Sequence, residues 1–167
     1  MKTMPLFLVL SLLLTTKASA ENCPASASEQ LEIYPTAEVL PENLLRMYVY
    51  YPRSMGIDEG FRNVQLLDDD GVVIEGAFLS NRVDLWSADR RRLTLLLDPG
   101  RVKTGLTAHR QLGRALVAEQ SYTLLVSGSA MDAEGCAIGD DARHRFSVEI
   151  ADEVAPAPSQ WVIRTPD

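Results

Sequence analysis

The chain of 167 residues contains only two cysteines and two histidines, which leaves few ligands for a zinc site of the usual kind. No C-x-x-C spacing occurs, so nothing supports a thioredoxin-like redox role. Positive charge is also scarce, because 16 Lys and Arg face 23 Asp and Glu, for a net charge of −7. Nucleic-acid binding usually requires a basic face, so this balance argues against it.

Long apolar runs are absent except near the N-terminus. Lys2 precedes an apolar segment, residues 5–14, that is interrupted only by Ser11. The segment is too short to span a bilayer comfortably, and no other stretch approaches the 18 or so residues needed. Residues 18–20, Ala-Ser-Ala, match a small-x-small cleavage signal. Residues 1–20 are therefore predicted to be a signal peptide cleaved after Ala20, which places the mature chain in the periplasm or outside the cell, without stable membrane insertion.

The mature chain has a stronger negative charge than the precursor. Cleavage removes Lys2 and Lys17 and no acidic residue, so 14 basic and 23 acidic side chains remain, a net charge of −9. Such a chain is repelled by anionic lipid surfaces. The sequence before Cys23 lacks the Leu-small-small triplet of a lipoprotein signal, so lipidation is not expected.

Two cysteines remain after cleavage, in a compartment that oxidises thiols. We expect Cys23 and Cys136 to form a disulfide. The bond would tie an N-terminal segment, residues 21–39, to a loop late in the domain and would close a long loop of the chain.

Short β-rich runs separated by turn signals recur through the middle of the chain. An Asp-Gly turn follows the second run and Asp-Pro-Gly ends the fifth, and both are typical chain reversals. Residues 104–118 are expected to be irregular, with at most a short helical turn. This pattern predicts an all-β fold, an antiparallel Ig-like β-sandwich of about seven to eight strands spanning 40–150, followed by a Pro/Ala-rich tail at 151–167. The runs are 44–51, 62–67, 72–79, 83–86, 92–97, 121–127 and 143–150.

Three segments have the order found in a known family. They are LPEN with LLRMYVYY at 40–51, QSYTLLV at 120–126 and MDAEGC at 131–136. Together they resemble bacterial Ig-like domains of the S-layer-protein type. The run LWSADRRRLTLLLDPGRVKTGL at 85–106 also resembles a set of exported bacterial proteins built on the same sandwich. The resemblance implies fold and export, and it implies no catalytic residues, because such domains share no active site.

A basic patch is the main candidate for binding. Its residues bracket one predicted strand and its turn, so they are expected to cluster at one end of the sandwich: Arg90, Arg91, Arg92, Arg101 and Lys103. Such a patch would dock an acidic envelope protein or an anionic glycan. The competing interpretation is internal pairing with the nearby Asp84, Asp89 and Asp98. Trp161, in the Pro-flanked tail, is a second candidate for a partner contact.

Metal and catalytic alternatives have weaker support. Copper prefers imidazole and thioether ligands, which His109 and His144 with Met47, Met55 and Met131 would supply. The acidic turn at 68–70 lacks the spacing of an EF-hand calcium loop, and no nucleophile-elbow motif indicates a hydrolase. We therefore expect no metal site, no cofactor and no catalytic centre. The sequence predicts a monomeric, non-enzymatic exported binding or assembly module, and the alternative is a small periplasmic copper-type metal-binding protein.

Overall fold

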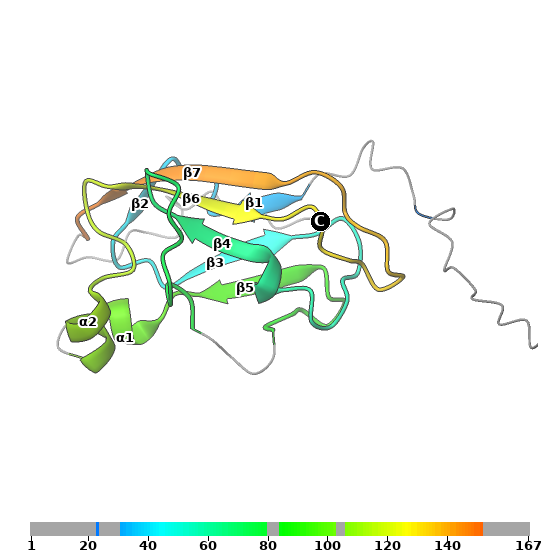
Figure 1. The fold of residues 1–167 in the computed structure, drawn as a ribbon, viewed down its shortest axis with the longest axis horizontal. Coiled ribbons are helices and arrows are strands. Elements are labelled where there is room, and N and C mark those ends of the chain that lie inside the picture. Colours follow the sequence, from blue (N-terminus) through cyan, green and yellow to red (C-terminus); the bar gives the residue numbers. More distant parts are fainter. Residues whose placement is uncertain (1–22, 24–30, 80–83, 103–105, 152–167) are drawn as a thin grey trace, which may run out of the picture.

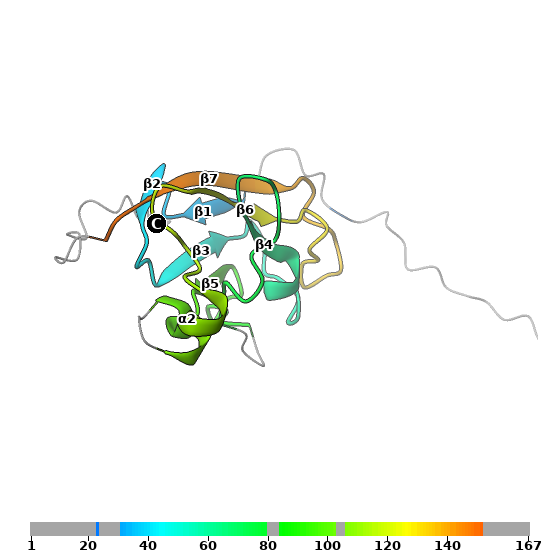
Figure 2. The same ribbon diagram turned by 60° about the vertical axis from the view of Figure 1, so that its left-hand side comes forward.

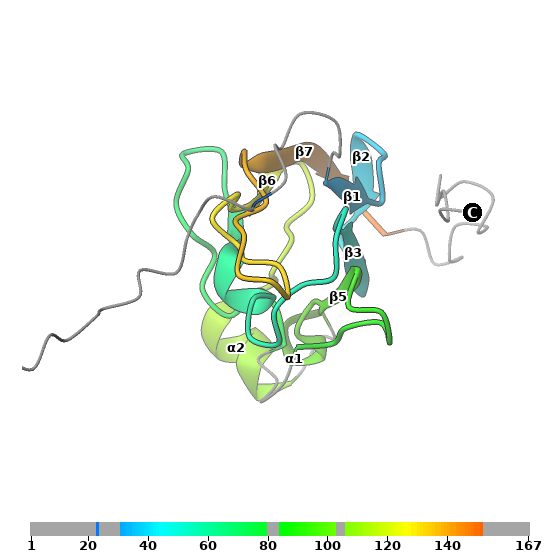
Figure 3. The same cartoon turned by 90° about the vertical axis from the view of Figure 1, so that its right-hand side faces the viewer.

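Two β-sheets face each other across one core in the computed structural model, which describes residues 23, 31–79, 84–102 and 106–151 (Figure 1). The three-stranded sheet has the order β1-β3-β5, with β1 at Glu32–Tyr34, β3 at Arg46–Tyr50 and β5 at Arg92–Leu96. The four-stranded sheet has the order β2-β7-β6-β4, with β2 at Val39–Pro41, β7 at Ala142–Glu149, β6 at Ser121–Val126 and β4 at Val64–Leu67. Figure 3 shows β6 and β7 separated from β3 and β5 by the interior. The predicted all-β sandwich is confirmed.

Alternation of apolar and polar residues builds the core. In β6 every second side chain is buried, and the same pattern runs through β3 and β5. Burying each such side chain stabilises the fold by about 1.5–3 kcal/mol. Leu45 alternates with the buried Met47 and Val49 and yet is 55% exposed, while Leu44 is buried. The strand begins only at Arg46, because a turn in which the Leu44 amide donates to the Pro41 carbonyl precedes it.

The strand order is that of an Ig domain. One sheet corresponds to strands A, B and E, and β4, β6 and β7 of the other correspond to C, F and G. The short β2 adds to the free edge of β7 in parallel, with Val39 opposite Ser147, so the sandwich is not antiparallel throughout as predicted. β1 lies wholly before residue 40, the predicted start of the sandwich, and β2 begins one residue before it.

A second Ig-like feature is a tyrosine corner at the start of β6. Tyr122 is buried, and its hydroxyl oxygen accepts a hydrogen bond of 3.0 Å from the backbone amide of Val117. Its ring also stacks on Phe146 at 6.0 Å. This arrangement, a tyrosine at the start of strand F bonded to the backbone a few residues upstream, is typical of Ig sandwiches.

The predicted strand at 72–79 does not form as a continuous strand. Its turn is as expected, since the Asp68 amide donates to the Val72 carbonyl and Gly71 has a positive φ of 78°. Beyond the turn, Val73 bridges to β4, whereas Phe78 bridges to Leu97 just beyond β5. The segment therefore crosses from one sheet to the other.

Two short helices occupy the stretch where turns and irregular chain were expected. Asp98-Pro99-Gly100 leads into α1 (Pro99–Val102), in keeping with the preference of proline for the first helical position. The second helix, α2 (Thr107–Leu112), follows it and packs on α1. No helix in the described ranges has the length and apolar character needed to cross a membrane.

The sandwich has two unlike ends (Figures 1 and 2). We call the end that carries α1 and α2 the helical end. At the other end, β3 and β6 finish and β4, β5 and β7 begin. We call this the loop end; it comprises residues 51–63, 84–91 and 127–141 and includes the short 3-10 helix η2 (Phe61–Asn63).

Candidate functional site

Backbone hydrogen bonds join two loops of the loop end. The amide of Gly56 donates to the Met131 carbonyl at 3.0 Å, and the amide of Ala133 donates to the Ser54 carbonyl at 2.8 Å. Met55 and Asp132 form an isolated antiparallel bridge between the same loops. The loops 51–63 and 127–141, which correspond to the B–C and F–G loops of an Ig domain, are therefore held side by side.

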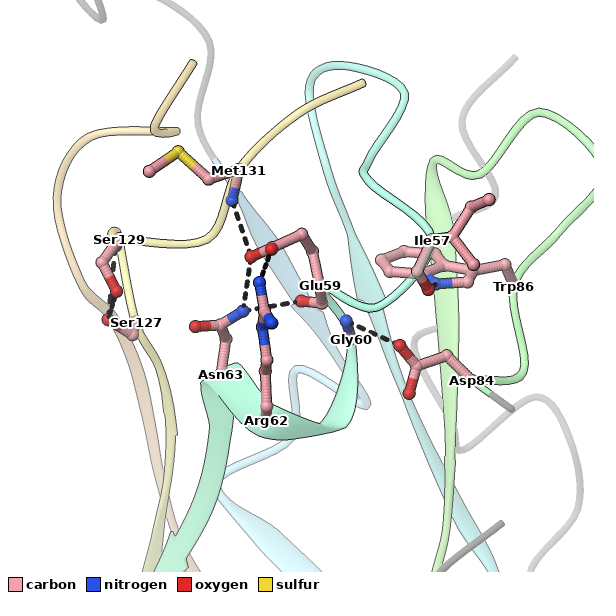
Figure 4. A network of polar contacts seen from close by, with 10 residues as sticks. All are labelled: Ile57, Glu59, Gly60, Arg62, Asn63, Asp84, Trp86, Ser127, Ser129 and Met131. Atoms are coloured by element: carbon pink, nitrogen blue, oxygen red, sulfur yellow. Dashed lines mark hydrogen bonds and ion pairs between the residues drawn. The ribbon is translucent and has the colours of Figure 1, made fainter. Parts of the chain in front are cut away.

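A buried carboxylate reinforces this junction (Figure 4). Glu59 is only 7% exposed. Its Oε2 accepts hydrogen bonds of 2.9 Å from the Asn63 side-chain amide and from the Met131 backbone amide, and its Oε1 forms an ion pair with Arg62. Buried charges are tolerated when they are paired and hydrogen-bonded, and here the pairing ties the loop 51–63 to the loop 127–141.

A third loop segment, residues 84–91, attaches to the same frame. The Asp84 carboxylate accepts hydrogen bonds from the amides of Gly60 at 2.8 Å and Phe61 at 3.1 Å, at the start of η2. The Trp86 indole donates to the Ile57 carbonyl at 3.3 Å (Figure 4). The Trp86 ring also packs on Tyr51, with centroids 5.3 Å apart. All three loops are thus cross-linked.

The predicted disulfide is confirmed and belongs to this end. Cys23 is bonded to Cys136, 113 residues further along the chain. Asp132 positions Cys136, because its Oδ1 accepts the Cys136 amide at 2.8 Å while its Oδ2 pairs with Arg53 at 3.3 Å. The disulfide anchors the N-terminal side of the domain to the loop 127–141.

Two large apolar side chains stand exposed on this cross-linked frame. Ile57 is 66% exposed and Met131 is 41% exposed. Met131 was predicted only as the start of an Ig-like turn segment or as a copper ligand, and no feature of the sequence pointed to Ile57. Neither residue belongs to a strand, so hydrophobic periodicity does not predict whether its side chain is exposed. The exposure follows from how the two loops are held against each other.

The arginine run at 90–92 divides between the loop end and the sheet face. Arg90 and Arg91 belong to the loop end, where the Arg91 Nε donates to the Tyr51 carbonyl at 3.4 Å. Arg92 begins β5, and its guanidinium carbon lies 5.6 Å from the centroid of the Tyr48 ring. Arg46 lies 5.7 Å from the same ring, which makes Arg46 and Tyr48 neighbours of the patch that sequence reasoning missed.

The expected pairing of these arginines with nearby aspartates is not present among the described residues. Asp84 binds backbone amides of η2, and Asp98 accepts the Gly100 amide at 2.8 Å. Asp89 accepts the Ser87 hydroxyl and the Arg91 amide, and the Ser87 bond is the main cause that lowers the pKa of Asp89. Each carboxylate is used locally, so no guanidinium group of the run forms an ion pair with a carboxylate within the described chain.

Arg101 corrects the expectation of one basic cluster. It lies at the helical end, beyond the far end of β5 from Arg92, and is only 5% exposed. Its guanidinium donates to the carbonyls of Glu75, Gly113, Leu112 and Arg114 at 2.6–3.2 Å, and burial lowers its pKa. Arg101 therefore fastens α1 to the chain around α2 and offers no docking surface. Lys103 and Trp161 lie outside the described residues.

The copper interpretation finds no support. His109 belongs to α2 and His144 to β7, which lie on opposite sides of the molecule (Figures 1 and 3). His144 contacts the Ala37 carbonyl at 3.2 Å and stacks on Phe146, and its burial lowers its pKa. Met47 and Met55 are buried in the core. The described residues contain no group of three His, Cys, Asp or Glu side chains placed to hold a metal ion.

Comparison with known proteins adds little to this geometry. No protein-family model matches the sequence, and no curated protein matches it. Among solved structures, the chain is similar to the native conformation of alpha-2-macroglobulin from E. coli, with a TM-score of 0.43 and 13% identity over 75% of this chain and 6% of that one. A crystal structure of native alpha-2-macroglobulin from Escherichia coli spanning domains MG0-NIE-MG1 gives a TM-score of 0.41 and 12% identity, over 75% of this chain and 34% of that one. The chain thus spans far less than two thirds of either structure.

The class of the protein follows from its own topology. The strand order, the tyrosine corner and the two facing sheets define an Ig-like β-sandwich with one disulfide between Cys23 and Cys136.

Proposed function

We propose that this chain is an exported, non-enzymatic module that docks a partner protein of the cell envelope at its loop end. Export rests on the signal-peptide pattern of residues 1–20 and on the disulfide, which persists in oxidising compartments. The free module is monomeric in this proposal.

The single observation that carries the proposal is the exposure of Ile57 and Met131 on loops that are already cross-linked. Interfaces gain most of their affinity from a few anchors in a desolvated centre. A surface held rigid before binding loses less conformational entropy when it binds. Glu59 and Asp84 supply that rigidity, because their carboxylates tie the three loops together.

Charge specifies the partner further. Arg90 and Arg91 flank the same surface and have no carboxylate partner among the described residues. The mature chain is strongly acidic, with a net charge of −9, and the loop end itself carries four arginines against eight aspartates and glutamates. Arg90 and Arg91 are therefore a local basic spot on an acidic end, and the partner we propose presents an apolar contact with carboxylates placed to meet these two arginines.

Site-specific photo-crosslinking in the native cell envelope tests the proposal. A benzophenone amino acid replaces Ile57 or Met131, and the matched control replaces Leu112, which is 58% exposed at the helical end. We expect one discrete protein adduct from Ile57 and Met131 and none from Leu112. Equal adducts at all three positions, or no adduct at the loop end, would overturn the proposal.

Two further kinds of substitution test the chemistry of the same contact: an apolar residue is replaced by a charged one, and the charge of the arginines is reversed. Ile57→Asp should abolish the adduct formed from Met131, whereas Leu112→Asp should leave it unchanged. The double variant R90E/R91E should reduce it at least several-fold if the border of the partner is acidic. Circular dichroism of each variant checks that the sandwich is intact, so that a lost adduct reports docking rather than unfolding.

A further inference from the structure

The outer face of the three-stranded sheet holds a tyrosine between two arginines. Arg46 lies two residues before Tyr48 on β3, and Arg92 pairs with Tyr50, two residues after it. The guanidinium carbons of the two arginines lie 5.7 and 5.6 Å from the centroid of the Tyr48 ring. A cation that stacks on an aromatic ring is oriented and held in place.

Neither arginine has a carboxylate partner among the described residues. The nearest acidic residue of this face in the strand register is Glu32, opposite Tyr50, and it accepts the Tyr34 hydroxyl at 2.5 Å. Arg46 and Arg92 are both exposed, so their donor groups face solvent. A fixed guanidinium without a carboxylate is a ready donor for an external anion.

We propose that Arg46, Tyr48 and Arg92 form a binding site for an extended acidic peptide, in which two carboxylates are each held by one guanidinium. The two guanidinium carbons are at most about 11 Å apart, because each lies within 5.7 Å of one ring centroid. Side chains on one face of an extended peptide repeat about every 6.6–7 Å, which falls within this upper limit. Two acidic side chains on one face of such a peptide can therefore reach the two arginines.

The same geometry disfavours an anionic glycan. Sugars bind flat sheet faces by stacking on open aromatic rings, but the Tyr48 ring is already engaged by two guanidinium groups. The site lies on the sheet face and includes neither Ile57 nor Met131, so it stands or fails independently of the loop-end proposal.

Fluorescence anisotropy of the mature, disulfide-bonded protein tests the site. The probe is a labelled peptide of alternating glutamate and serine, and polygalacturonate competes as the glycan. We expect R46Q/R92Q to weaken peptide binding roughly tenfold or more, because each bond to a charged group is lost. The matched control is R143Q/R145Q, which removes the same charge from the outer face of the other sheet and should change binding less than about twofold.

The ring is tested separately. Tyr48→Phe keeps the aromatic face and should bind like the natural protein, whereas Tyr48→Leu should lose several-fold in affinity because the arginines are no longer held. Equal losses in R46Q/R92Q and R143Q/R145Q would show that only net charge matters. Tighter binding of polygalacturonate than of the peptide would assign the face to a glycan, and a lack of peptide binding by the natural protein would also overturn the proposal.

Discussion

Arg92 begins β5 and Arg101 follows its far end by five residues, yet their surroundings are opposite. Arg92 stacks on Tyr48 with its guanidinium open to solvent, while Arg101 is enclosed by four backbone carbonyls. A third environment lies on the outer face of the other sheet, where Arg143 and Arg145 pair with Asp141 and Asp69. The role of each arginine therefore depends on whether hydrogen-bond acceptors or carboxylates of the same chain reach its guanidinium group.

The two ends of the sandwich also differ, because the loop end has a disulfide in addition to its hydrogen bonds, whereas Arg101 fastens the helical end by hydrogen bonds. Replacing both cysteines, C23S/C136S, should produce the largest effect, a loss of about 2–4 kcal/mol in the free energy of unfolding, since a loop of over one hundred residues is released. Urea unfolding followed by circular dichroism measures it. An unchanged midpoint would mean that the loops 51–63 and 127–141 hold that end without the disulfide.

Arg101→Met should cost about 3 kcal/mol, because four carbonyls at the helical end lose their donor. The control is Arg92→Met at the other end of β5, which should change stability by less than about 0.5 kcal/mol. The same urea titration compares them. Equal losses in the two variants would remove the distinction between a structural and a surface arginine.

Two buried tyrosines allow a finer comparison. Tyr122→Phe should destabilise the fold by about 1–2 kcal/mol, because the Val117 amide loses its acceptor. Tyr51→Phe should change little at neutral pH, since the Tyr51 hydroxyl is buried without a hydrogen-bond partner among the described residues. Thermal unfolding at neutral pH separates the two, and a larger loss in the Tyr51 variant would contradict the assignment.

Alkaline pH sharpens the Tyr51 prediction. Burial, with a further contribution from Asp84, raises the pKa of Tyr51 well above its ordinary value of 10.0. The contribution of the neutral hydroxyl to stability is complete below the ordinary pKa of 10.0. It falls as the pH rises above 10.0, because the tyrosine of the unfolded chain ionises before the buried one does. Unfolding measured from pH 9 to 11 should show a shallower decline for Tyr51→Phe than for the natural protein. Parallel declines would contradict a buried, neutral Tyr51.

The smallest effect is expected on the outer face of the four-stranded sheet. Arg145→Gln breaks the exposed pair with Asp69, whose atoms are 2.6 Å apart, and should change stability by less than about 1 kcal/mol. The effect should shrink further at high salt. A loss as large as that of Arg101→Met would mean that exposed pairing, and not enclosure by carbonyls, makes an arginine structural here.

Part of this structure could be predicted from the sequence because local residue patterns determine it. Alternation in 121–126 and 92–96 predicted β6 and β5, and the Asp-Gly signal predicted the turn at 68–71. The continuous strand at 72–79 was not found, because its two halves pair with different sheets. The cluster of Arg46, Tyr48 and Arg92 was not predicted either. It forms because β3 pairs with β5, and these strands are more than forty residues apart in the sequence.

By itself, the sequence determined the sandwich class through its short alternating runs and the disulfide through two cysteines in an exported chain. The sandwich class depends on local periodicity, and the disulfide depends only on two cysteines being the whole set that can pair, so neither requires knowledge of the packing. Only the tertiary structure decided which arginines are free, because that depends on where carbonyls and carboxylates from distant segments come to lie. The enclosure of Arg101 by Glu75 and residues 112–114, and the exposure of Ile57 and Met131 on joined loops, are consequences of long-range packing.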